Sequence, residues 1–323
     1  KTARKEAADN GAAPKGADDV MDQPEVSVVM ATRDRPQLLR RAVASVLAQD
    51  TEVPIEILLV YDGTEIDELE DLPLPPHRTV RAFANGRTPG LAGARNTGIL
   101  EAGSPLVAFC DDDDEWTPSK LRRQLPLFED PDVILAATGI EIHSAGGTHV
   151  REGPASVELA DLLRSRITAL HPSSFMLRAA ALRGALGLVD EDLPGGQGED
   201  YDMLLRAAKL GRIRTIPEPL TIVHWDRTSF FTVNWQRTVD GLGYLLAKHA
   251  EFRSTRAGQS RLQGQIAFAH GALGDRPRAR SWAAQALRND PRQHRAYLAL
   301  LVGTGLVSGE RVMAELNKRG RGV

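Results

Sequence analysis

Short apolar runs alternate with amphipathic segments through the first two thirds of the chain. A strand-like run ending at Met30 is followed, behind Pro36, by apolar residues at helical spacing, and this order of strand and helix then recurs. Such alternation predicts a parallel α/β sheet. The predicted strands are 26–30, 55–61, 80–83 and 106–110, and the predicted helices between them are 36–47 and 91–102.

The pattern continues less regularly to about residue 211. It predicts helices from Thr117 to near Phe128, at 157–164, at 179–186 and at 199–210, and strands at 133–143 and 174–177.

From residue 236 the periodicity is helical, with the spacing of one tetratricopeptide-type hairpin. A single hairpin cannot bury its own apolar face. We therefore expect it either to pack on the α/β part or to form a homodimer through these helices.

Polar residues follow three of the predicted strands at their carboxyl ends, where open sheets bind ligands. They are Thr32-Arg33-Asp34, Asp62-Gly63-Thr64 and the run Asp111 to Asp114. Two like charges 4 Å apart repel by about 1 kcal/mol in water and by more inside a protein. A divalent cation relieves this repulsion, and carboxylate oxygens favour Mg²⁺ or Mn²⁺. A solvated acidic turn is the alternative interpretation.

A second acidic pair, Glu199-Asp200, begins a predicted helix after the glycine-rich stretch 195–198. The helix dipole favours acids in this position, so a structural role stands beside a chemical one.

Charge and composition exclude several classes of protein. The net charge of −3 lacks the basic footprint of a nucleic-acid-binding protein. Residues 251–323 nevertheless hold 13 Lys and Arg against 5 Asp and Glu, which fits an anionic partner or a solvated surface. No apolar run approaches the roughly 20 residues of a membrane helix. With the single Cys110 and no signal-peptide pattern, we expect a cytoplasmic protein or one peripheral to a membrane, with a flexible segment at 1–24.

Five segments, in order, resemble those of the family 2 glycosyltransferases with the GT-A fold. They are 26–36, 62–64, 93–98, 109–116 together with Lys120-Leu121, and 198–202. The resemblance covers about residues 25–225. It implies an α/β GT-A domain at 25–235 followed by a small all-α region at 236–323.

The resemblance also implies roles for residues in the donor site. Asp62 would accept a hydrogen bond from the nucleobase, while Arg33 and the backbone near Ala31 would line the nucleoside pocket. Ribose or sugar hydroxyls would be held by Asp111, Asp112 and Arg95, and Asp113 would be the principal metal ligand. The family usually has two acids where this chain has Tyr61-Asp62. A UDP-sugar is the favoured donor, with dTDP- and GDP-sugars as alternatives.

The expected chemistry follows from these residue types. A departing diphosphate needs an electrophile, which Mn²⁺ or Mg²⁺ held by Asp113 and His224 would supply. Asp200 would act as the general base, and one base acting in line gives inversion. Glu199, Trp116 and Trp225 are the candidates for contact with the unknown acceptor.

Two other functions are weighed against this one. A nucleotidyltransferase would favour a glycine-rich, basic phosphate loop early in the chain, which 32–36 is not. A non-catalytic scaffold would use the helical region to bind a partner, and the intact Asp113 and Asp200 argue against it.

Overall fold

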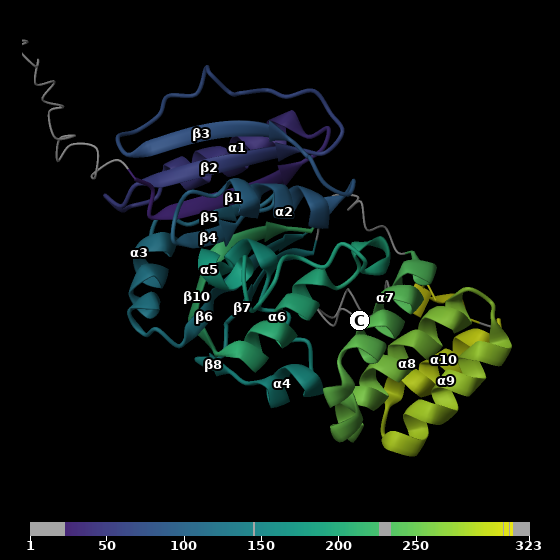
Figure 1. The fold of residues 1–323 in the computed structure, drawn as a ribbon. Helices are drawn as coiled ribbons and strands as arrows, with labels where there is room; N and C mark the ends of the chain where they lie inside the picture. The colour runs from purple at the N-terminus through teal and green to yellow at the C-terminus, as the bar shows by residue number, and fades with distance from the viewer. Residues whose placement is uncertain (1–22, 145, 226–233, 306, 310, 313–323) are drawn as a thin grey trace, which may run out of the picture.

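A computed structural model describes residues 23–144, 146–225, 234–305, 307–309 and 311–312 (Figure 1). The predicted flexible segment at 1–24 therefore lies, apart from its last two residues, outside the described part. Within that part no helix is both long and apolar enough to cross a membrane.

The amino-terminal half is a parallel sheet covered on both faces. Its strands β1 to β4 are parallel neighbours in the order β3-β2-β1-β4. Successive side chains of β1 point to opposite faces, so Val29 packs with Ile99 of α2 while Met30 packs with Leu39 of α1. The elements are β1 (Val26–Thr32), α1 (Pro36–Leu47), β2 (Ile55–Tyr61), β3 (Arg78–Ala84), α2 (Leu91–Glu101) and β4 (Leu106–Phe109).

One glycine sets the close approach of α2 to the sheet. A Cβ atom at Gly98 would lie 2.4 Å from Cγ1 of Val29, so only glycine fits there without a shift of the helix.

The second half adds antiparallel strands, so the sheet as a whole is mixed, while the parallel pairing predicted from the alternation holds for β1 to β4. The full order is β3-β2-β1-β4-β9-β6-β10-β5, in which β9 is antiparallel to β4 and β6, and β5 is antiparallel to β10. Strands β5 and β9 are short, and an antiparallel neighbour does not need the crossover helix that a parallel neighbour needs. The strands are β5 (Glu115–Trp116), β6 (Val133–Ser144), β7 (Gly147–Arg151), β8 (Ser156–Val157), β9 (Met176–Arg178) and β10 (Arg212–His224).

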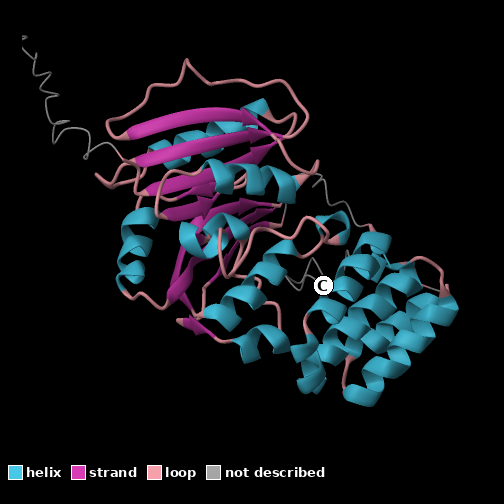
Figure 2. Cartoon of the chain, viewed as in Figure 1, coloured by secondary structure: helices cyan, strands magenta, loops and turns pink. Residues whose placement is uncertain are grey.

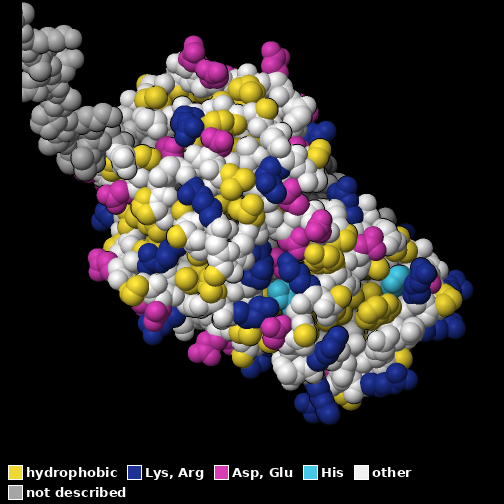
Figure 3. Space-filling model, viewed as in Figure 1, with side chains coloured by type: hydrophobic (Ala, Val, Ile, Leu, Met, Phe, Trp, Pro, Cys, Tyr) yellow, Lys and Arg dark blue, Asp and Glu magenta, His cyan; other side chains and the backbone are white. Residues whose placement is uncertain are grey.

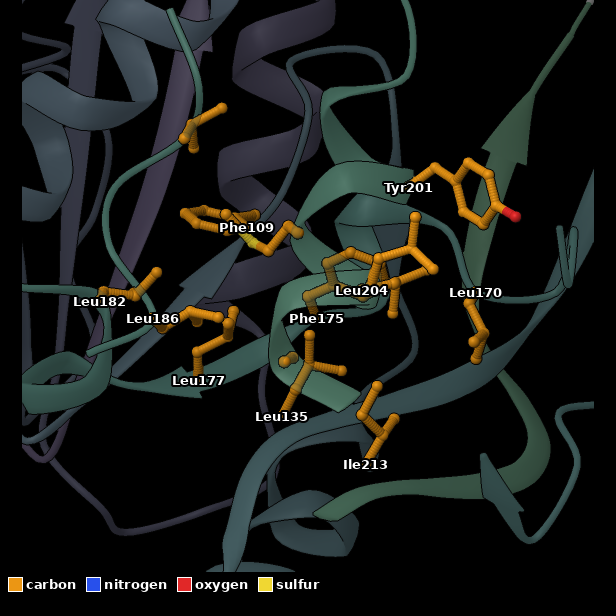
Figure 4. Close-up of a cluster of buried hydrophobic side chains, with 14 of the residues drawn as sticks. Phe109, Leu135, Leu170, Phe175, Leu177, Leu182, Leu186, Tyr201, Leu204 and Ile213 are labelled. Carbon is orange, nitrogen blue, oxygen red and sulfur yellow. The ribbon is translucent and has the colours of Figure 1, made fainter. Parts of the chain in front are cut away.

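Three of the four helices predicted in this half are shorter than predicted, whereas the helix at 199–210 has the predicted bounds. The helix expected from Thr117 to Phe128 is α3 (Lys120–Gln124) followed by a 3₁₀ segment at Leu125–Glu129, because Pro126 cannot continue the backbone hydrogen bonds. The other helices are α4 (Leu159–Arg164), α5 (Ala179–Leu182) and α6 (Glu199–Leu210), with 3₁₀ turns at Pro172–Ser174 and Pro194–Gly196. Figure 4 shows the core under α6, where Leu204 faces Leu135 and Phe175.

The carboxyl-terminal region is helical, as Figure 2 shows. It comprises α7 (Trp235–Lys248), a 3₁₀ turn at Ala250–Ser254, α8 (Arg256–Ala272), α9 (Arg276–Asn289) and α10 (His294–Gly303). Alanines such as Ala267, Ala283 and Ala299 form most of its own core. The tetratricopeptide-like character of α8 and α9, and the domain bounds at 25–235 and 236–323, stay predictions.

This region packs on the α/β part, which is one of the two arrangements expected. Leu245, Phe252 and Leu262 belong to the same buried cluster as Tyr201 of α6. Beside them the fully buried Asp202 accepts hydrogen bonds from His249 (2.8 Å) and Arg206 (2.8 Å). The helical region therefore supports the helix that begins with Glu199 and Asp200.

Candidate functional site

A cavity of about 860 Å³ lies at the carboxyl edge of β1, β2 and β4, and α6 and α7 close its other side. Its lining comes from segments far apart in the chain, including the acidic run and the amino-terminal end of α6. Of the residues predicted to form the site, those lining it are Ala31, Arg33, Asp62, Asp111, Asp112, Asp113, Glu199, Asp200, His224 and Trp225.

Asp62 is held in place at one end of the cavity. Its carboxylate accepts from the backbone N–H of Gly90, with both oxygens at 3.0 Å, and from Nδ2 of Asn85 at 2.8 Å. Gly90 has φ of 120°, which favours glycine and lets its N–H point at the carboxylate. Nη1 of Arg33 lies 3.6 Å away. This end of the cavity is therefore pre-formed around one carboxylate.

The acidic run divides into two groups. Asp112 accepts from Oγ1 of Thr32 (2.7 Å) and, with Asp113, from Nη1 of Arg35 (3.1 and 2.7 Å). Burial, followed by the charge of Asp113, raises the pKa of Asp112 to about 6. Arg35 thus provides a positive charge for two of the four aspartates.

Asp111, Asp114 and His171 form the other group, and their ligand atoms lie within 4.8 Å of one another. Burial and the charges of Asp111 and Asp113 raise the pKa of Asp114 well above its usual value. Two carboxylates and an imidazole suit Mn²⁺ or Mg²⁺, and a cation would relieve the crowding of like charges. The residues therefore fit a divalent metal site.

The two residues predicted as metal ligands lie outside this group. Asp113 is paired with Arg35, and Nε2 of His224 lies 2.9 Å from Oε1 of Glu115. Both line the cavity, so their role at a metal stays a prediction.

Asp200 and Glu199 face the cavity from the first turn of α6. The carboxylate of Asp200 accepts from its neighbour's backbone N–H (2.8 Å) and pairs with Arg166, which raises the pKa of that arginine. The N-cap is Gly198, and Asp200 does not cap the helix.

Arg95 joins the two acidic segments. Its Nη2 donates to Asp111 (2.6 Å) and its Nη1 donates to Glu199 (3.1 Å). Burial raises the pKa of Glu199 to about 7 in spite of this pairing. Arg95 does not line the cavity itself, but it sets the spacing of the carboxylates that do.

The structure corrects the placement of Trp116. Its indole is 3% exposed, donates from Nε1 to the carbonyl of Ser173 (2.7 Å), and does not line the cavity. Nζ of Lys120 lies 3.7 Å from the ring centroid. Trp116 is therefore a core residue, in the same buried cluster as Leu121 and Met176. Trp225, by contrast, is 50% exposed at the cavity.

Five titratable residues at the cavity were not singled out from the sequence: Arg35, Arg166, His171, Glu191 and Arg237. Glu191 accepts from Arg87 (2.5 Å) and Asn96 (2.7 Å), and these bonds help to lower its pKa to about 2. Only Arg35 lies next to a recognised pattern, before the proline that begins α1. The others lie in irregular loops or on a remote helix, where sequence gives no signal.

Residues 27–184 match the family described as Glycosyl transferase family 2. This part of the chain is a family 2 glycosyltransferase domain. A relative in Bacillus subtilis (strain 168), the uncharacterized glycosyltransferase YwdF, is 28% identical over 198 residues, which cover 60% of this chain and 71% of YwdF. Over the first three curated relatives the match spans from 34% to 71% of the relative's own length.

Solved structures confirm the GT-A-like fold of this glycosyltransferase. The Staphylococcus aureus TarS fragment 1–349 in complex with UDP-GlcNAc has a TM-score of 0.58 at 15% identity, covering 92% of both chains. The mannosyltransferase PcManGT from Pyrobaculum calidifontis in complex with GDP-Man and Mn²⁺ has a TM-score of 0.54 at 17% identity, covering 92% of this chain and 83% of that one. Identities this low establish the fold alone.

Proposed function

We propose that this glycosyltransferase moves a sugar from a nucleotide-diphosphate donor to an acceptor hydroxyl, with inversion and with the help of a divalent cation. One observation carries the proposal: a single cavity is lined by the nucleoside-end carboxylate, the acidic cluster and Asp200. These are the parts that a transfer from a nucleotide sugar requires, at the carboxyl edge of the sheet where ligands bind.

The donor would bind with its base at Asp62 and its ribose or sugar hydroxyls near Asp111, Asp112 and Arg95. A UDP-sugar stays the favoured donor. The carboxylate can accept the imide N–H of uracil, and thymine presents the same N–H, so a dTDP-sugar is an alternative. Solved structures of similar fold hold UDP-GlcNAc or GDP-Man, which supports a nucleotide-sugar donor without deciding its base.

Mn²⁺ or Mg²⁺ would be held by Asp111, Asp114 and His171, with Asp113 as the ligand that the family pattern adds. When bound, such a cation stabilises the negative charge of the departing diphosphate. Arg35 keeps Asp113 close to the other carboxylates. The fold neighbour in complex with Mn²⁺ supports this assignment.

Asp200 would take the proton from the attacking hydroxyl. Its pairing with Arg166 fixes the direction of the carboxylate, which a base needs before the acceptor arrives. Glu199 and Trp225 would contact the acceptor beside it. A cytoplasmic location belongs to the same proposal. The single Cys110 cannot form a disulfide within the chain, so the fold needs no oxidising compartment.

Incubation with UDP-, GDP- and dTDP-sugars and Mn²⁺ tests the proposal, with the released nucleotide analysed by chromatography. We expect slow release of nucleoside diphosphate from one donor, with water replacing the acceptor. Release of pyrophosphate from a nucleoside triphosphate would favour a nucleotidyltransferase instead. Failure to bind or turn over any nucleotide sugar would favour a scaffold.

A further inference from the structure

The outward face of α10 is apolar. Tyr297, Leu300 and Leu301 are 53%, 37% and 44% exposed, and their spacing places them side by side on one face of the helix. The opposite face carries Ala296 and Ala299, which are fully buried against the neighbouring helices. Exposed apolar residues scattered singly are ordinary, but three adjacent ones on the outer helix of a region indicate a contact surface.

Two arginines border this face. A groove of about 160 Å³ between α9 and α10 is lined by Arg276 and Arg280 on one side and by Leu300 on the other. Arg276 and Arg280 are one helical turn apart, so both guanidinium groups lie on the same side of α9. Figure 3 shows Lys and Arg side chains along the outer edge of the carboxyl-terminal helices, with hydrophobic side chains between them.

We propose that this surface, formed by Arg276 and Arg280 of α9 and Tyr297, Leu300 and Leu301 of α10, binds an anionic lipid surface. The apolar side chains enter the boundary between headgroups and acyl chains, and the arginines pair with lipid phosphates. The net charge of +8 over residues 251–323, against −11 for the remainder, directs the helical region toward such a surface.

A second copy of the chain is a poorer occupant for the same surface. A two-fold contact buries the same patch on both sides, so it would gather Arg276 and Arg280 of both copies with no acidic residue of the patch to pair them. That repulsion is absent when the partner is anionic. The proposal does not depend on the sugar transfer proposed above, because lipid binding is measured without donor or acceptor.

Sedimentation of the full chain with vesicles tests the proposal. Vesicles of phosphatidylcholine alone are compared with vesicles containing an equal amount of phosphatidylglycerol. We expect binding to the anionic vesicles only, weakened by salt. The double variant Arg276→Gln with Arg280→Gln should bind about 25-fold more weakly, at about fivefold for each arginine. Leu300→Ser with Leu301→Ser should also bind more weakly.

Two control variants test whether vesicle binding depends on this surface or only on the total charge and apolar exposure of the protein. Arg122→Gln with Arg123→Gln makes the same change of charge on α3, and Leu74→Ser removes another exposed leucine. Both should bind as the parent does, and cooperative melting of each variant shows that it is folded.

Equal losses in the controls, equal binding to neutral vesicles, or no binding at all would overturn the proposal. A dimer that dissociates in Leu300→Ser with Leu301→Ser, without vesicle binding by the parent, would identify the surface as a contact between copies.

Discussion

At the scale of single residues, the account depends most on Asp200. Its carboxylate is 6% exposed, paired with Arg166, and directed to the cavity by the start of α6. Burial disfavours the charged form of the adjacent Glu199. Its pKa is raised to about 7, so it carries a proton for part of the time at neutral pH. A carboxyl group that holds a proton can donate a hydrogen bond to the acceptor beside the base.

Asp200→Asn should lower the rate of transfer by roughly 10²–10⁴-fold, because asparagine keeps the shape of the side chain but cannot accept a proton. Affinity for donor and cation should stay within a few-fold of the parent value. Steady-state kinetics and calorimetry measure the two quantities. Asp192→Asn, the same change at an exposed position, should be neutral. Transfer by Asp200→Asn at near the parent rate would place the base elsewhere.

At the scale of elements, helix α3 contains an unusual buried lysine. Lys120 is fully buried, donates to Oε1 of Gln124 (2.7 Å) and lies against the ring of Trp116. Burial lowers the pKa of its amine to about 7, well below the value in an unfolded chain. Between these two values the unfolded chain binds the extra proton, so the free energy of unfolding increases as pH rises.

We expect the stability of the parent relative to Lys120→Met to increase from about pH 7 to about pH 9, with a slope of up to about 1.4 kcal/mol per pH unit. Below about pH 7 the amine is charged in both the folded and the unfolded chain, so the difference in the free energy of unfolding should level off. Urea denaturation across this range measures it. A flat difference for Lys120→Met would show that the amine stays charged.

Elements with long, regular patterns could be predicted from the sequence, and short ones could not. The prediction of β1, β2, α2 and α6 is confirmed to within a few residues, because each is long enough to show its period. Strands β5 and β9 have two and three residues, too few to show alternation, and their antiparallel pairing depends on distant partners. The shorter α3 could have been predicted, because Pro126 lies within the range that was expected to be one helix.

The residues of the site also divide into those that the sequence predicts and those that it does not. Asp62, Asp111 and Asp200 were predicted because they follow or begin regular elements that end at one edge of a sheet. His171 and Arg166 come from an irregular segment between α4 and β9, and Arg237 reaches the cavity from α7. Only tertiary packing brings these three residues to the cavity, so no local pattern could identify them.

At the scale of the whole molecule, the helical region is part of the fold of the catalytic domain. Leu245, Phe252 and Leu262 complete the core around Tyr201, and Oη of Tyr201 accepts from Arg261 (2.8 Å). Removal of the region would also leave Asp202 buried without His249 and Lys248. Arg206 would remain as a partner, but each hydrogen bond lost to a charged group costs about 1.5–3 kcal/mol, a large share of the stability of a typical domain.

A fragment ending at residue 236 should therefore aggregate or unfold without cooperativity, as shown by light scattering and thermal melting. The single change His249→Ala tests the same contact in the full chain and should lower the free energy of unfolding by about 1–3 kcal/mol. His294→Ala, at an exposed position, should change it by less than about 0.5 kcal/mol. A soluble, cooperatively folded and active fragment would show that the helical region is dispensable.

The central claim is that the cavity binds a nucleoside diphosphate together with a divalent cation. Calorimetric titration of UDP and GDP in Mn²⁺ and in EDTA tests it most directly, with the parent, Asp113→Ala and His171→Ala. We predict that the parent binds one nucleotide at least about tenfold more tightly in Mn²⁺, a difference of about 1.4 kcal/mol, and that either substitution reduces this gain. Equal affinity in Mn²⁺ and EDTA, or an undiminished gain in both variants, would contradict the account.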